Sequence, residues 1–251
     1  MTNFNERALA AEAARLCPWH YPLLLGSVAV PLGKQKRVKQ LRGHAAVRER
    51  ILVDSLLRHY DFSGKRILDL GCAGGYWGGF YAKHGAKFYL GVDGRQHIID
   101  QGNLYWKTNN FLPIEQYKFL LADVMSARTW RTIKEYEPFD FCLLAGLLYH
   151  LPKPYTVLKR AIKIASEAIV VDTQTNSKKD KPSIKRGINF GRLPQHTKAV
   201  SPHRDTLLAI LNKSVKFCID LAAGVDVSDH RWPPGQTYHG GKRIAMLLLK
   251  Q

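Results

Sequence analysis

The sequence has few cysteines, and none of them stands in a metal-binding pattern. Its four cysteines are widely separated, without a Cys-x-x-Cys pair and without the Cys/His spacing of a zinc site. Three of them lie in apolar, strand-like runs, where a free thiol behaves as a small hydrophobic side chain. We therefore expect no metal site, reduced core thiols and a cytoplasmic location.

Long hydrophobic runs are missing as well. The longest apolar stretches, Pro22 to Leu32 and Phe141 to Leu151, are about a dozen residues long, whereas a membrane-spanning helix needs roughly 20. No basic segment leading into an apolar run and a small-residue cleavage site follows Met1. The expectation is a mature protein that starts at Met1, is not secreted and does not span a membrane.

Acidic residues are scarce relative to basic ones. The 251 residues contain 20 Asp and Glu against 38 Lys and Arg, which gives a formal net charge of +18. Such an excess favours encounters with a polyanion, namely nucleic acid, a phosphorylated small molecule or an anionic surface. The alternative is that the charge serves only solubility. A hydrophobic fraction of 45% at this length indicates one globular domain with a small extension.

The chain divides by pattern near residue 60. Residues 1–60 form a basic extension, with helices predicted over Arg7–Cys17 and Gln35–His59, the second having one apolar face. Residues 61–251 alternate short β-rich runs with helical ones, which predicts βαβ units and a mainly parallel sheet. The seven predicted strands are Arg66–Cys72, Phe88–Asp93, Phe119–Val124, Phe139–Leu144, Ala168–Thr173, Val215–Leu221 and Arg243–Leu249.

A glycine-rich turn follows the first of these strands. The run from Ile67 to Gly75 is a hydrophobic strand with an acidic residue near its end and a turn into a helix, where a ligand can lie against bare backbone. A dinucleotide-binding turn needs G-x-G-x-x-G, but Ala73 and Tyr76 occupy its second and third glycine positions. The pattern therefore disfavours NAD.

The turn resembles motif I of the class I S-adenosylmethionine-dependent methyltransferases. Asp69, Gly71 and Gly75 match its acidic-x-Gly-x-Gly-x-Gly pattern, and Ala73 replaces the central glycine, which such turns accept when φ is negative. The resemblance implies a Rossmann-like α/β fold of seven strands in the order 3-2-1-4-5-7-6, with the last strand antiparallel. It also implies S-adenosylmethionine as cofactor.

Two further strand ends fit a nucleoside site. Twenty-four residues after Asp69, the second strand ends at Asp93, whose carboxylate can accept from both ribose hydroxyls. After the third strand, Asp123 and Val124 resemble the family's adenine site, in which the aspartate accepts from the exocyclic amine and the next backbone N–H meets the ring.

The fourth strand leads into the segment from Gly146 to His150. It resembles a methyltransferase branch that includes the tRNA wobble-uridine carboxymethyltransferases, which use carboxy-S-adenosylmethionine. That likeness makes Gly146 a cofactor-site residue, Tyr149 a contact of the transferred group and the carboxylated cofactor a less favoured alternative. His150, with a pKa near neutrality, is the predicted general base, or else it only positions the acceptor.

The preferred acceptor is an oxygen or nitrogen atom of RNA, such as tRNA. A basic loop at 176–200 leaves the sheet on the cofactor side, and with Phe190, Trp232 and Tyr238 it would grip phosphates and stack bases. The residues predicted to contact the substrate are Lys178, Lys185, Arg186 and Arg192.

Three alternatives stay open. The first is a small-molecule or glycan acceptor, and the second is RNA ribose 2′-O-methylation, which the run Gly74-Gly75-Tyr76-Trp77 faintly resembles. The third is a catalytically silent methyltransferase fold that binds nucleic acid, which the acidic strand ends at Asp69, Asp93 and Asp123 disfavour. The oligomeric state is not predicted.

Overall fold

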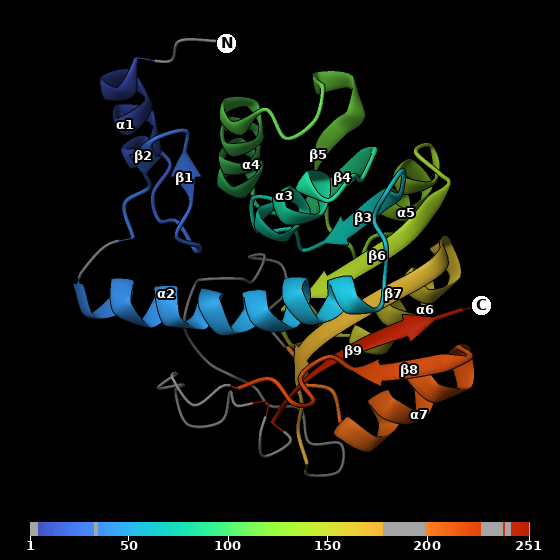
Figure 1. The fold of residues 1–251 in the computed structure, drawn as a ribbon. Coiled ribbons are helices and arrows are strands. Elements are labelled where there is room, and N and C mark those ends of the chain that lie inside the picture. Colours follow the sequence, from blue (N-terminus) through green and yellow to red (C-terminus); the bar gives the residue numbers. More distant parts are fainter. Residues whose placement is uncertain (1–4, 33–34, 178–198, 227–237, 239–241, 251) are drawn as a thin grey trace.

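The computed structural model describes residues 5–32, 35–177, 199–226, 238 and 242–250, and its centre is a seven-stranded sheet (Figure 1). The strands are β3 (Arg66–Leu70), β4 (Phe88–Asp93), β5 (Tyr117–Leu121), β6 (Phe139–Ala145), β7 (Ala165–Gln174), β8 (Phe217–Asp220) and β9 (Arg243–Leu249). Their order is β5-β4-β3-β6-β7-β9-β8. β3 to β7 pair in parallel, whereas β9 is antiparallel to both β7 and β8. The predicted fold class and strand order are confirmed.

Helices cover both faces of this sheet. The connecting helices are α3 (Tyr76–Lys83), α4 (Gln96–Asn109), α5 (Ala127–Lys134), α6 (Pro154–Ile164) and α7 (Arg204–Ser214). Neighbouring residues of a strand point to opposite faces, so Ile67 joins the apolar cluster that contains Trp77 and Trp106. Leu68 joins the other cluster, with Leu158 and Leu207. Burial on both faces explains the continuous apolar runs of the sequence.

The first N-terminal elements, up to residue 29, pack beside α4, whereas the long helix that follows them runs past α3 (Figure 1). These N-terminal elements are α1 (Glu6–Arg15), the short strands β1 (Leu24–Leu25) and β2 (Val28–Ala29), and the long helix α2 (Gln35–Glu49). α2 continues through a π-helical segment, η1 (Arg50–Ser55), and a 3₁₀ turn, η2 (Leu56–Arg58). The helical prediction for Gln35–His59 therefore holds in outline. The β1–β2 hairpin was not predicted, because two-residue strands carry no detectable alternation.

Strand boundaries differ from the prediction at one place that matters for the site. β5 ends at Leu121, so Asp123 and Val124 lie in the loop after it and not within the strand. β5 begins at Tyr117, two residues before the predicted start of this strand. Its buried side chains are Tyr117 and Phe119, which alternate with more exposed residues. No helix in the described ranges is long and apolar enough to cross a membrane.

Candidate active site

A cavity lies at the carboxyl ends of the central strands, where parallel α/β sheets bind ligands. Most of the predicted cofactor and catalytic residues line it together: Gly71, Ala73, Asp93, Asp123, Val124, Gly146, Tyr149 and His150. Asp69 and Gly75 are not among the residues that line it. The N-terminal part of the chain supplies further lining side chains, which are His20, Tyr21, His44 and Arg48.

The turn after β3 runs almost entirely through left-handed backbone. Gly71, Gly74 and Gly75 have φ values of +73°, +82° and +75°, and Ala73 has a φ of +46°. The expectation of a negative φ at Ala73 is therefore wrong. The left-handed conformation of an alanine costs roughly 1–2 kcal/mol of conformational free energy. In this conformation the Ala73 backbone N–H donates to Asp93 Oδ2 over 3.3 Å. The turn thus holds its strained residue at the cavity wall.

Gly75 is required by packing. A Cβ atom there would lie 2.5 Å from Trp106 Nε1 and 2.7 Å from Phe119 Cζ. Both rings are buried, and the Trp106 indole donates a hydrogen bond to the Gly75 carbonyl over 3.0 Å. This glycine lets the first turn of α3 approach the aromatic cluster beneath it.

Asp69 is buried beside the cavity and does not reach it. Its Oδ2 accepts a hydrogen bond from the Tyr89 hydroxyl over 2.8 Å, and its side chain is 1% exposed. Burial raises the pKa of Asp69 to about 7, with Asp93 adding to the effect and the Tyr89 hydrogen bond opposing it. In the structure, the Asp69 side chain therefore links β3 to Tyr89 of β4 and is not among the groups that line the cavity.

Replacing Asp69 with asparagine is expected to make folding less sensitive to pH. In the unfolded chain this carboxyl has a pKa near 4. Between pH 4 and 7 the unfolded state therefore releases a proton that the folded state keeps, and wild-type stability falls as pH rises, by up to about 4 kcal/mol. The Asp69→Asn variant lacks this fall. Urea unfolding of both proteins from pH 5 to pH 8 measures it, and parallel curves would contradict the assignment.

Asp93 is the last residue of β4 and lines the cavity, where its side chain is paired with that of Arg95, two residues further along the chain. Its carboxylate accepts from Arg95 Nε over 2.8 Å and from Arg95 Nη2 over 2.9 Å. The Arg95 backbone N–H adds a contact of 3.2 Å. Asp93 was predicted from its place at a strand end, whereas Arg95, which also lines the cavity, carries no such signal in the sequence.

The cavity is also lined by aromatic and imidazole groups. Tyr149 and His150 lie on the 3₁₀ turn η4 (Leu148–His150) after β6, with ring centroids 4.2 Å apart. Burial, with Arg48 next, lowers the pKa of His44 well below its usual value, so its imidazole is neutral at physiological pH. Nothing in a single sequence indicates that His20 and His44 line the same cavity as Tyr149 and His150.

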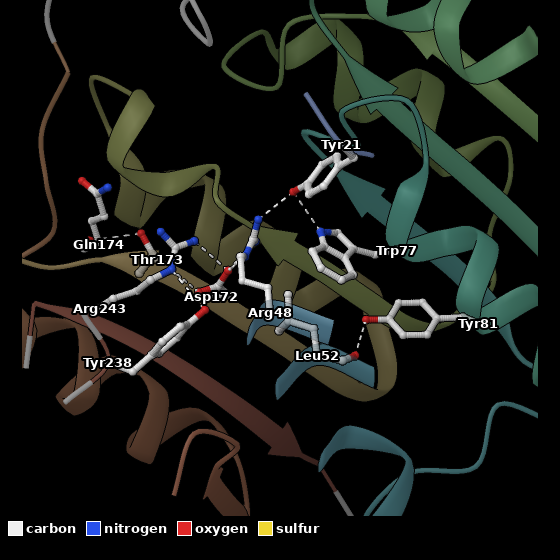
Figure 2. Close-up of polar contacts among 10 residues, drawn as sticks. All are labelled: Tyr21, Arg48, Leu52, Trp77, Tyr81, Asp172, Thr173, Gln174, Tyr238 and Arg243. Carbon is white, nitrogen blue, oxygen red and sulfur yellow. Dashed lines mark hydrogen bonds and ion pairs between the residues drawn. The ribbon is translucent and has the colours of Figure 1, made fainter. Parts of the chain in front are cut away.

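A buried ionic cluster joins α2 to the sheet beside the cavity (Figure 2). Asp172 on β7 accepts from Arg243 Nε and Nη2 of β9, both over 2.7 Å, and from Arg48 Nε over 2.9 Å. Tyr238 donates to it over 2.9 Å, and Arg48 Nη1 donates to the Tyr21 hydroxyl over 2.6 Å. Asp172 and both arginines are at most 2% exposed. Asp172 lies near the carboxyl end of β7, as Asp93 does in β4. An acidic residue near the end of an apolar run is visible in the sequence and could have indicated Asp172 as a candidate.

The predicted substrate residues Lys178, Lys185, Arg186 and Arg192 lie outside the described residues, as do Phe190 and Trp232. Tyr238 is described, and it is buried with its hydroxyl on Asp172, so the prediction that it stacks bases is wrong. Its ring is held inside the protein by the ionic cluster. Among the residues that the structure describes, no group of three or more His, Cys, Asp or Glu side chains is placed to hold a metal.

Several known proteins with similar sequences or folds are methyltransferases, although no family model matches the chain. It is 26% identical over 187 residues to the ubiquinone biosynthesis O-methyltransferase of Neisseria meningitidis serogroup A, covering 74% of this chain and 73% of that protein. It is 30% identical over 132 residues to the tRNA U34 carboxymethyltransferase of Colwellia psychrerythraea, covering 49% of this chain and 38% of that protein.

A solved structure extends the likeness to the whole chain. The N-terminal domain of EvdMO1 with SAH bound superimposes with a TM-score of 0.67 at 18% identity, covering 99% of this chain and 98% of that one. The chain therefore has the fold of the class I S-adenosylmethionine-dependent methyltransferases, and its sequence is similar to those of a ubiquinone biosynthesis O-methyltransferase and of the tRNA U34 carboxymethyltransferases.

Proposed function

We propose that the chain catalyses methyl transfer from S-adenosylmethionine to an oxygen or nitrogen atom of an acceptor bound in the same cavity. The observation that carries this proposal is the convergence of the left-handed turn, Asp93 and the Asp123–Val124 loop on one cavity. These are the features that the sequence assigned separately to the cofactor. When bound, the cofactor supplies an electrophilic methyl group.

The residues divide between two parts of the cavity. On the nucleoside side, we assign Asp93 to the ribose hydroxyls and the loop at Asp123 and Val124 to the adenine. On the acceptor side, Tyr149 and His150 hold the nucleophile in line with the methyl group, and His150 takes up its proton. Alignment of two bound reactants accounts for much of the rate in such a reaction, so the base need not be strong.

Replacing Asp93 with alanine is expected to weaken S-adenosylmethionine binding by about 2 kcal/mol, because hydrogen bonds from hydroxyls to a charged acceptor are lost. Titration calorimetry measures this. The matched control is His150→Ala, which removes a lining side chain from the acceptor side and leaves cofactor affinity nearly unchanged. Equal affinity in the Asp93→Ala variant and the wild type would rule out the ribose assignment.

For the acceptor, we propose a small organic molecule that carries a hydroxyl or amine. His20, Tyr21 and His44 come from the N-terminal part of the chain and close on the cavity that also contains Tyr149, so the reacting group is surrounded by protein on several sides. A relative that matches over most of its length carries the name of an O-methyltransferase of ubiquinone biosynthesis. Turnover with hydroxylated aromatic compounds, followed by release of S-adenosylhomocysteine, tests this acceptor class.

RNA is the second candidate, favoured by the net charge of +18 and by the tRNA-modifying relative. If Lys185 and Arg186 hold phosphates, affinity for bulk tRNA falls by roughly 0.7 log units per log unit of salt for each contact to a single strand. The double alanine variant then binds more weakly and with a flatter salt dependence. Filter binding measures both. Absence of saturable binding at about 150 mM salt would leave the small-molecule acceptor.

A further inference from the structure

The carboxylate of Asp93 is already surrounded by donors from its own chain. Oδ1 accepts from Arg95 Nε and from the Arg95 backbone N–H, while Oδ2 accepts from Arg95 Nη2 and from the Ala73 backbone N–H. A carboxylate offers about four lone-pair sites for hydrogen bonds. A ribose hydroxyl can therefore donate to Asp93 only where one of these donors gives way.

The donor that can give way is the Arg95 side chain. The two backbone donors belong to the turn after β3 and to the residue that precedes α4, and neither moves without the main chain. The Arg95 side chain is 23% exposed and lines the cavity, whereas the Asp93 side chain is 4% exposed. The pair is thus a contact at the cavity surface, unlike the enclosed pair of Arg48 and Asp172, which are 2% and 0% exposed.

We propose that Arg95 sets the affinity for the nucleoside part of the cofactor by competing with the ribose for Asp93. Arg95 is a positioning residue in this account: it holds the carboxylate in place, and the two hydroxyls take over the oxygen sites of Nε and Nη2. The released guanidinium turns toward the open part of the cavity. This inference rests on the proposed function, because it takes Asp93 as the ribose acceptor.

Removal of the competitor therefore tightens binding. A partly exposed ion pair contributes roughly 1 kcal/mol, which corresponds to about fivefold in a dissociation constant. In the Arg95→Ala variant the ribose meets an uncontested carboxylate, so S-adenosylhomocysteine is expected to bind about fivefold more tightly than to the wild type. Arg95→Gln keeps much of the side-chain length without the charge. It shows the same direction and serves where the alanine variant does not fold.

A double-mutant cycle separates competition from a general structural effect. We would measure S-adenosylhomocysteine affinity by calorimetry for the wild type, Arg95→Ala, Asp93→Asn and the double variant. The gain from removing Arg95 is expected only where Asp93 is present, because the amide introduced by Asp93→Asn carries no charge for the guanidinium to hold. Salt gives a second readout: higher salt screens the Arg95–Asp93 pair and tightens binding to the wild type, and it leaves the Arg95→Ala variant unaffected.

The possible failures point to different conclusions. Unchanged or weaker binding by both Arg95 variants would overturn the competition, as would an equal gain in the Asp93→Asn background. Failure of the wild type itself to bind S-adenosylhomocysteine or S-adenosylmethionine would contradict the proposed function instead.

Discussion

Replacing Asp172 with asparagine is expected to lower the free energy of unfolding by about 3–5 kcal/mol, because two buried guanidinium groups lose the carboxylate between them. Burial alone would raise the pKa of the Asp172 carboxyl, but Arg243 and Arg48 outweigh it and hold that pKa well below its usual range. The carboxylate is therefore a charged partner at all physiological pH values. Urea unfolding at neutral pH measures the loss.

The matched control is Asp54→Asn, which changes an exposed aspartate and is expected to shift stability by less than about 0.5 kcal/mol. The pH dependence adds a check with a definite sign. A depressed folded pKa stabilises the protein above about pH 4 and loses that contribution as pH falls further. The wild type should approach the Asp172→Asn variant in stability on acidification. Equal stability of the two at neutral pH would show that the cluster is not a support of the fold.

Replacing Gly75 with alanine is expected to destabilise the protein by roughly 2–5 kcal/mol. The residue has a φ of +75°, which costs an alanine about 1–2 kcal/mol, and the new methyl group would overlap the Trp106 and Phe119 rings. Trp106 stacks on Tyr89 with ring centroids 4.2 Å apart, so it has little room to retreat. The midpoint of thermal or urea unfolding measures the effect.

Gly64→Ala separates backbone strain from overlap. Gly64 has a φ of +71°, and no atom lies within 4 Å of the position where its Cβ would be. This variant should therefore show only the conformational cost, about 1–2 kcal/mol. If the two glycine variants lose the same stability, the contact of Gly75 with the aromatic cluster is not what makes this glycine necessary.

The sequence was enough to predict the sheet, its strand order through the family resemblance, and most of the residues after the strands that line the cavity. These features are local: apolar runs form strands, a glycine-rich turn follows the first strand, Asp93 ends the second and Asp123 follows the third. Since the carboxyl ends of parallel strands meet at one edge, residues that are far apart in the chain converge there by topology alone. The order of the strands is therefore enough to place Asp93 and Asp123 at the same cavity.

The lining that comes from the N-terminal segment and from Arg95 could be known only from the tertiary structure. Arg48 is 124 residues from Asp172 and Arg243 is 71 residues from it, and in the sequence Arg48 is one of several basic residues on a helix. Similarly, Arg95 is an ordinary residue before a helix until its side chain folds back onto Asp93. Sequence patterns report which face of an element is buried. They do not report which charged groups become neighbours on folding. The pairing of Arg48 with Asp172, for example, depends on how α2 packs against the sheet.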